Sequence, residues 1–428
     1  MKKFLLFLIF FLPFQFALNP TQGIDLSIAR LLIVLAFFVW FISSLLKKKI
    51  LIKNNYITWG LLLFLVLALF SIIKAEEVSW ALRKLLVFVS IFPLYFLITQ
   101  YFNKKDFEKI SKTILTSSTI IALLGVFQFL SQFLWDKMTV FNFWSKYLAR
   151  FFLGEAFAQS VITNPSWWVN IGGRTLLRAT SLFPDPHMLS FFLGMTLPLV
   201  IPFLFKKKAS LRHYTIYTIV TLINLTALVL TFSRGGYLGL IASGLILFFL
   251  LFKYLNQRQK LLIVLASLLL IIAVVAIGPV RSRLLSSFDF SEGSVSGRLE
   301  IWNQSLSVWL KNFWLGVGIG NYSYYLSPLH SYRAPIYAHN TYLDIGVEMG
   351  ILALLAWFSI FIYAIYKLST LNIRHSVSSI QKMCIISSLV YFSTHALFDT
   401  PIYSPRILPI LMVIYALASI LINKKRAS

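Results

Sequence analysis

The stretch YAHNTYLDIGVEMGILALLAWFSIFIYAIY at residues 337–366 indicates which class of protein this chain belongs to. Its apolar run, 341–365, has the length of a helix that crosses the hydrocarbon core of a membrane. Two acids, Asp344 and Glu348, lie within this run, although the chain has only 14 acidic residues among 428. The stretch therefore predicts a membrane-spanning helix that carries polar side chains for a specific reason.

The composition of the whole chain agrees with this prediction. Hydrophobic residues make up 58% of the sequence and charged residues only 12%, which is not the composition of a water-soluble domain. Apolar runs of spanning length recur, so we expect an all-α polytopic membrane protein with about twelve transmembrane helices. The predicted spans are 4–18, 29–46, 56–73, 81–100, 113–134, 186–205, 214–232, 237–252, 261–279, 341–365, 383–400 and 406–422. The first span also fits a signal peptide, but no small-residue cleavage site follows it, which favours a retained helix.

Two connections are much longer than the others and divide the chain into five parts. These are helices one to five at 1–134, an outer loop at 135–185, helices six to nine at 186–279, a large outer loop at 280–340, and helices ten to twelve at 341–428. The remaining connections are short. Chemistry at the membrane surface is therefore expected on the side of the two long loops.

The distribution of positive charge predicts the orientation of the spans. The net charge is +25, and more than half of the 39 Lys and Arg residues lie in the short connections of one side, with only Asp106 and Glu108 as acids. Cytoplasmic loops are enriched in Lys and Arg, so both termini are predicted to be cytoplasmic and the long loops to face outward. Basic residues distributed in this way do not form a nucleic-acid groove, and no G-x-x-x-x-G-K-[ST] phosphate loop is present.

Four polar residues mark the start of the span at 341–365. Asn340, Asp344 and Glu348 are four residues apart and therefore share one face of a helix. A helix cap explains Asn340, and the helix dipole favours an acid in the first turn. Glu348 lies two turns into the span, where an ionisable side chain usually faces a polar interior or a partner. His339, at the outer surface, is the natural acid–base candidate.

Arginines form the second group of candidate residues. In TFSRGGYLGL at 231–240, Arg234 stands beside a helix N-terminus, where free N–H groups and a guanidinium favour phosphate binding. The alternative interpretation is a tight hairpin with an interfacial arginine and glycines that form a helix-packing face. Arg178 and Arg298 lie in the two long loops on the same predicted side.

Three motifs occur in a specific order: SRGG at 233–236, GRLEIW…GVGIGNY across 297–322, and HNTYLDIGVEMGILALLAWF at 339–358. Together they resemble the O-antigen ligase and polymerase family of bacterial membrane glycosyltransferases. The resemblance covers 214–365 by motif and the whole chain by topology. It implies the fold of a C-type glycosyltransferase, with a large periplasmic loop between two late helices.

The resemblance also implies roles for individual residues. His339 matches the histidine that acts as catalytic base or positions the acceptor, and Arg234 and Arg298 match arginines that bind pyrophosphate. Arg178 looks like a further arginine of this kind. The supporting residues in the same motifs are Ser233, Asn340, Asp344 and Glu348. The resemblance implies neither a metal ion nor another cofactor.

The expected function is that of an O-antigen ligase in the bacterial inner membrane. Such an enzyme transfers a glycan from undecaprenyl pyrophosphate to lipid A–core oligosaccharide on the periplasmic face, with inversion at the anomeric carbon. O-antigen or exopolysaccharide polymerases and protein O-glycosyltransferases share the donor-site motifs, so these alternatives stay open. The expected partners are the lipid-linked glycan, a lipid A–core or glycan acceptor, and membrane lipid, but not nucleic acid. A flippase or transporter would place charges near the midplane, whereas the candidates here gather at the outer surface.

Overall fold

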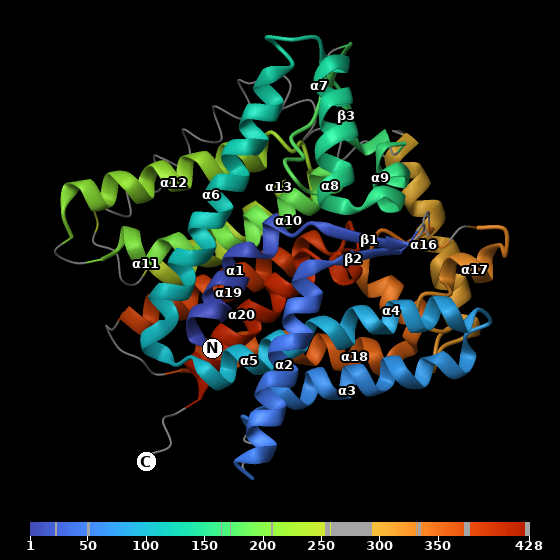
Figure 1. The fold of residues 1–428 in the computed structure, drawn as a ribbon, viewed down its shortest axis with the longest axis horizontal. Helices are drawn as coiled ribbons and strands as arrows, with labels where there is room; N and C mark the ends of the chain where they lie inside the picture. Colours follow the sequence, from blue (N-terminus) through green and yellow to red (C-terminus); the bar gives the residue numbers. More distant parts are fainter. Residues whose placement is uncertain are drawn as a thin grey trace.

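The computed structural model shows a helical protein whose long helices pack at several angles (Figure 1). The structure describes residues 1–21, 24–48, 52–163, 165–171, 173–206, 209–252, 257, 293–330, 332, 335–371 and 377–423. The predicted ninth span, 261–279, lies outside the described residues.

Helices make up most of the described chain. In the first half they are α1 (Lys2–Phe11), α2 (Ile28–Leu46), α3 (Tyr56–Ser71), α4 (Val78–Ile91), α5 (Pro93–Tyr101), α6 (Phe107–Ser131), α7 (Lys137–Phe143), α8 (Arg150–Leu153), α9 (Glu155–Ile162), α10 (Pro186–Thr196) and α11 (Ile201–Leu204). In the second half they are α12 (Leu211–Val229), α13 (Arg234–Phe252), α16 (Gly293–Lys311), α17 (Tyr322–Leu326), α18 (Thr341–Thr370), α19 (Val377–His395) and α20 (Ile407–Ile422). Two antiparallel hairpins pair β1 (Ala17–Thr21) with β2 (Ile24–Ser27) and β3 (Trp168–Ile171) with β4 (Arg174–Leu177). The expectation of an all-α chain therefore missed two short hairpins.

Seven helical segments of the described chain are long and apolar enough to cross a membrane. They are Ile28–Leu46, Tyr56–Lys74, Val78–Tyr101, Lys104–Ser131, Pro186–Leu204, Arg234–Phe252 and Thr341–Thr370. The predicted seventh, eleventh and twelfth spans form α12, α19 and α20, which are helices but do not meet the same criterion of length and hydropathy. A polytopic helical membrane protein is thus confirmed, while the number twelve stays a prediction.

The first predicted span, 4–18, is shorter than expected. Helix α1 ends at Phe11, a 3₁₀ turn spans Leu12–Phe14, and strand β1 begins at Ala17. Pro13 lies in the turn, and proline ends an α-helix because it lacks the N–H group and clashes with the preceding turn.

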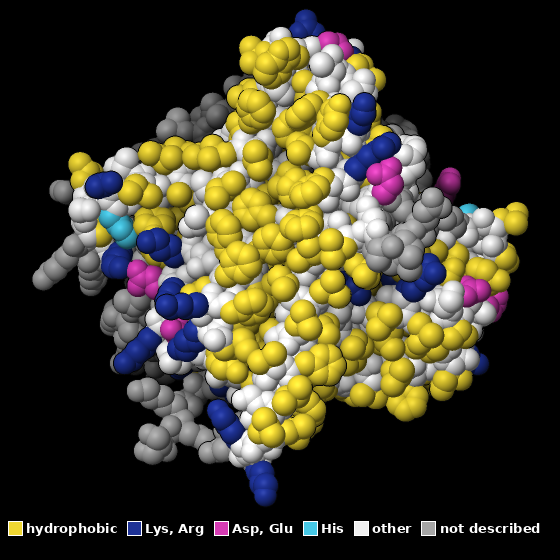
Figure 2. Space-filling view, in the orientation of Figure 1, with side chains coloured by type: hydrophobic (Ala, Val, Ile, Leu, Met, Phe, Trp, Pro, Cys, Tyr) yellow, Lys and Arg dark blue, Asp and Glu magenta, His cyan; other side chains and the backbone are white. Residues whose placement is uncertain are grey.

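The molecular surface carries the apolar side chains of a protein that contacts lipid. Hydrophobic side chains cover most of the central part of the face in Figure 2, whereas many Lys and Arg side chains lie at its left and lower edges. Leu46 of α2 is 80% exposed, Phe249 of α13 is 68% exposed and Ile362 of α18 is 65% exposed. Soluble monomers rarely expose contiguous apolar surface of this kind. These helix faces therefore contact the membrane.

Ion pairs connect segments that are predicted to be cytoplasmic. Lys2 Nζ lies 2.9 Å from Asp106 Oδ2, and Lys206 Nζ lies 2.6 Å from Glu108 Oε1. All four residues belong to the basic, short connections of the chain. The structure thus brings these connections together, and their orientation towards the cytoplasm stays a prediction.

A buried arginine joins segments on the side of the long loops. Arg406, just before α20, donates to the backbone carbonyls of Gln15 at 3.1 Å and Phe152 at 2.7 Å. It also donates to the carbonyls of Pro13 and Leu182. Because a guanidinium offers five N–H donors, one side chain can join the segment before β1, the long loop at 135–185 and the start of the last helix.

Glycines allow the turn before α17 to lie against the spans. Gly316, Gly318 and Gly320 have φ angles of +68°, +96° and +72°, which glycine adopts with little strain. A Cβ on Gly318 would lie 2.6 Å from Ala75 Cα, and one on Gly316 would collide with the backbone of Glu348. This turn therefore packs directly against the α3–α4 connection and α18.

Candidate functional site

His339 lies immediately before α18, in the left-handed backbone region that non-glycine residues adopt uncommonly. Its φ angle is +49°, and a non-glycine residue held in this region costs about 1–3 kcal/mol. Its side chain is 48% exposed. The next residue, Asn340, caps α18 as predicted, because its Oδ1 accepts from the N–H groups of Tyr342 and Leu343 at 3.0 and 3.2 Å. His339 is therefore partly exposed at the surface, and the Asn340 cap fixes the helix start that follows it.

A carboxylate that the sequence interpretation did not select lies beside this histidine. Asp399 follows α19, and its Oδ1 is 3.7 Å from His339 Nδ1. Its Oδ2 is 3.6 Å from Nδ1 of His187, near the start of α10. As a hydrogen-bond acceptor and as a negative charge, Asp399 raises the pKa of His339 above its ordinary value, while burial and Arg298 oppose this shift. Two histidines that lie far apart in the sequence thus share one carboxylate.

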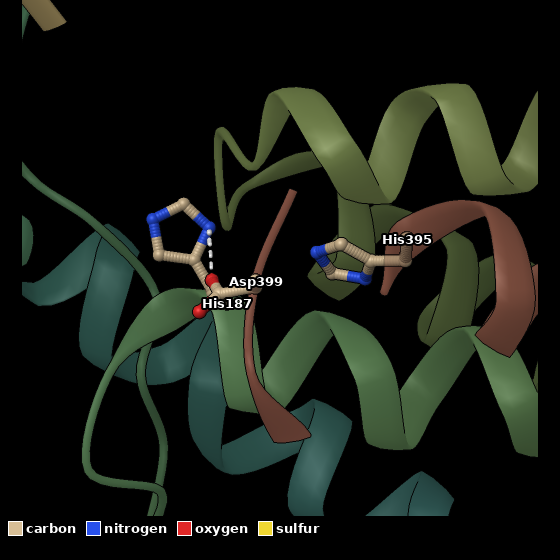
Figure 3. A group of neighbouring side chains, drawn as sticks. All are labelled: His187, His395 and Asp399. Atoms are coloured by element: carbon tan, nitrogen blue, oxygen red, sulfur yellow. Dashed lines mark ion pairs between the residues drawn. The ribbon is translucent and has the colours of Figure 1, made fainter. Parts of the chain in front are cut away.

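Figure 3 shows His187 and Asp399 joined by their ion pair, with His395 nearby. Hydrogen bonds through Ser233 continue from His187 into the protein interior. His187 Nδ1 is 3.0 Å from Ser233 Oγ, and Ser233 Oγ is 3.2 Å from His395 Nε2. His395 is fully buried, and its ring stacks on Phe191 with the ring centroids 3.6 Å apart. Ser233 therefore links two histidines that come from α10 and α19.

Three of these side chains also form the kind of group that holds a metal ion. One ligand atom each from His187, His395 and Asp399 lies within 4.8 Å of the other two. Two imidazoles and one carboxylate would suit Zn²⁺ or Fe²⁺. However, the positive charge of Arg298 acts on His187, His395 and His339, and it opposes a divalent cation at this place. Asp399 acts on His187 and His395 with the opposite sign, so charges of both signs surround this group.

Arg178, which was predicted to bind pyrophosphate, is buried and hydrogen-bonds to backbone carbonyls. Its Nε donates to the carbonyl of Thr231 at 2.7 Å, and its Nη1 donates to the carbonyl of Ser166 at 2.8 Å. Its charge also acts on His187. Arg178 therefore holds the connection before α13 in place and adds positive charge near the histidines.

The structure bears out the glycine packing face of the SRGG stretch, while phosphate binding by Arg234 stays a prediction. Arg234 is the first residue of α13 and is buried, not exposed at an interface. A Cβ on Gly235 would lie 2.6 Å from His395 Cδ2, and one on Gly239 would lie 3.1 Å from the carbonyl oxygen of Tyr391. The glycines therefore form the packing face of α13 against α19, and this face positions His395.

Asp344 joins the residue before His339 to the segment that follows α19. Its Oδ1 accepts from the N–H of Ala338 at 2.8 Å, and its Oδ2 accepts from the hydroxyl of Thr400. Thr400 is next to Asp399 in the chain. One buried carboxylate thus connects the segment that carries the histidine to the segment that carries its acidic partner.

Glu348 has a different set of partners one turn further along α18. Its carboxylate accepts from the hydroxyl of Tyr403 and hydrogen-bonds to the backbone of Gly320 and Tyr322. The glycine-rich turn before α17 is therefore fastened to α18 by this side chain. This contact explains why an acid stands two turns inside the span.

Sequence reasoning missed Asp399, His395 and His187. A usable signal was present, because HALFDTP at 395–401 places a histidine and an acid at the end of an apolar run. DPH at 185–187 does the same at the start of another. The chain has only six histidines, so each polar cluster at a span end was informative.

A family model matches the part of the chain that carries several of these residues. Residues 219–358 match the family model described as O-antigen ligase. This segment belongs to the O-antigen ligase family. The ligase-family segment is about a third of the chain and includes Ser233, Arg234, Arg298, His339, Asn340, Asp344 and Glu348. Arg178, His187, His395 and Asp399 lie outside it. No match to a curated protein was found.

Proposed function

We propose that this protein is a membrane glycosyltransferase of the O-antigen ligase type. It transfers a glycan from undecaprenyl pyrophosphate to lipid A–core oligosaccharide at the periplasmic face of the bacterial inner membrane. One observation carries the proposal: His339, half-exposed and strained, lies 3.7 Å from Asp399 and within the electrostatic reach of Arg298. This pairing of an acid–base group with positive charge suits displacement of a pyrophosphate.

The chemistry follows from the charges of these groups. An acceptor hydroxyl attacks the anomeric carbon, and the bond from that carbon to the pyrophosphate oxygen breaks, with inversion. Neutral His339 accepts the hydroxyl proton, and Asp399 stabilises the imidazolium that forms. Arg298 and Arg234 compensate the negative charge that develops on the leaving lipid pyrophosphate.

A polymerase with the same donor chemistry is the second candidate. The family match covers 219–358, which includes the donor-site motifs that ligases and polymerases share. A polymerase would use another lipid-linked glycan as acceptor with the same His339 and Arg298. The choice of acceptor therefore separates the two functions.

The test uses the full chain, purified and reconstituted in liposomes with undecaprenyl-pyrophosphate-linked glycan. Glycan on added lipid A–core supports the ligase, and longer lipid-linked chains without that acceptor support the polymerase. Transport of the lipid-linked glycan without a new glycosidic bond overturns the enzyme proposal.

Variants of the same preparation test the site. His339→Ala and Arg298→Ala should abolish transfer and leave the elution profile of the protein unchanged. The matched control is His330→Ala, which changes a histidine of the same loop whose Nδ1 is 2.9 Å from the carbonyl of Ser323. Full activity of His339→Ala would overturn its assignment as the base.

A further inference from the structure

A buried lysine in α4 has no part in the mechanism above. We propose that Lys84 is a positioning residue for His339: it holds Tyr337, two residues before the histidine, and so keeps the strained connection in its active conformation. This inference rests on the proposed function, and it assigns a role in that function to the N-terminal part of the chain.

Lys84 is enclosed by groups that can hold a cation. It is 7% exposed, and its Nζ donates to the hydroxyl of Tyr337. The same Nζ lies 4.6 Å from the ring centroid of Tyr337 and 4.1 Å from that of Tyr403, within the range of cation–π contacts. A buried ionisable residue in a spanning segment usually marks a functional site with a specific partner.

Two acids of α18 supply the compensating charge. The carboxylates of Glu348 and Asp344 act electrostatically on Lys84. Tyr403 connects the lysine to Glu348, because its ring faces Nζ and its hydroxyl donates to the carboxylate. The Lys84 stem also lies against the glycine-rich turn, where a Cβ on Gly320 would be 2.5 Å from Lys84 Cγ. The lysine therefore occupies one defined position.

Fixed contacts lead from Lys84 to the histidine. Lys84 holds Tyr337 from α4, and Asp344 holds the N–H of Ala338 from α18. Trp302 of α16 donates to the carbonyl of Ala338 at 2.9 Å. His339 follows directly with its positive φ. A strained backbone persists only where its surroundings over-determine it, and these three helices provide that constraint.

Stability alone is a weak reason for a buried lysine at this place. Replacing a buried ion pair with apolar residues of similar volume is often neutral or stabilising by about 1–4 kcal/mol. An aliphatic side chain at position 84 could fill the space beside Tyr403 but could not donate to Tyr337. The ammonium group of Lys84 therefore adds a hydrogen bond to the segment that carries His339.

The experiment compares three variants in the reconstituted transfer assay. Lys84→Met should lower kcat about 10²-fold with KM within about twofold of wild type, the effect of a misplacement of roughly 1 Å. Lys84→Met/Glu348→Gln removes both charges, and should recover the thermal stability of the wild type but not its kcat. Lys74→Met changes an exposed lysine next to α3, and it should have the kcat and the thermal stability of the wild type.

A second measurement does not depend on turnover. Diethyl pyrocarbonate modifies exposed imidazoles, and mass spectrometry gives the rate at His339. We expect this rate to change at least about twofold in Lys84→Met and to stay unchanged in Lys74→Met, because a freed connection alters how the ring is presented.

The outcomes separate this inference from the proposed function. Recovery of kcat together with stability in the double variant, or an unchanged modification rate in Lys84→Met, would overturn the positioning role. If the wild type transfers no glycan to any acceptor, the proposed function fails, and the modification rates still decide whether Lys84 positions His339.

Discussion

Replacing Gly235 with alanine should disable the site while the protein stays folded. An ideal Cβ on Gly235 would lie 2.6 Å from His395 Cδ2 and 3.1 Å from Phe398 Cβ, whereas ordinary contacts begin at 3.4 Å. The imidazole must therefore move by about 0.8 Å to accommodate the methyl group. The ring is fully buried and stacked on Phe191, so this move disturbs its packing.

The magnitude follows from this displacement. Ser233 Oγ and His395 Nε2 are 3.2 Å apart, and lengthening this distance by about 0.8 Å would break the hydrogen bond. Overpacking of a buried site costs about 1–3 kcal/mol of stability. A misplacement of about 1 Å near reacting groups lowers the rate about 10²-fold. We therefore expect a moderate fall in stability and a much larger fall in transfer.

Initial rates of glycan transfer and thermal unfolding of the detergent-purified protein measure the two effects. The control is Gly244→Ala in the same helix, where a Cβ meets nothing within 4 Å. Alanine in a helix interior is favoured over glycine by about 0.5–1 kcal/mol, so this variant should keep the wild-type rate and be at least as stable as the wild type. A wild-type transfer rate in Gly235→Ala, or an equal loss in Gly244→Ala, would refute the reasoning.

Three further substitutions test other parts of the structure. Asp399→Asn should move the acid limb of the pH–rate profile to lower pH, because Asp399 raises the pKa of His339 and the neutral imidazole is the active form; an unmoved limb would contradict this role. Gly350→Ala should abolish the monodisperse peak in size-exclusion chromatography, because its φ angle is +77° and a Cβ would overlap the carbonyl oxygen of Trp314. Arg406→Met should lower the unfolding free energy by at least about 3 kcal/mol, since each hydrogen bond from a charged group contributes about 1.5–3 kcal/mol; thermal unfolding at the wild-type temperature would count against it.

The class of fold could be predicted because hydropathy depends on local composition. The start of α18 at Thr341 was predicted correctly, since the Asn340 cap and the following apolar run are adjacent in sequence. The β1–β2 hairpin and the early end of α1 were not predicted. They depend on a proline within the run and on pairing between short strands, which carry little periodic signal.

The candidate site was predicted only in part, for a related reason. Scarcity of polar residues singled out His339, Asp344 and Glu348. Their partners come from a segment more than 50 residues away, where Thr400 contacts Asp344 and Tyr403 contacts Glu348. No local pattern shows which hydroxyl meets which carboxylate.

The sequence by itself determined that this chain is a membrane protein and which few polar residues stand out in it. The tertiary structure decided what those residues do: Lys84 meets Tyr337 across 253 positions, and Asp399 lies beside His339. The physical reason is that an apolar run forms a spanning helix in any lipid bilayer, whatever the rest of the chain does. A buried polar group needs a specific partner, and only packing supplies that partner.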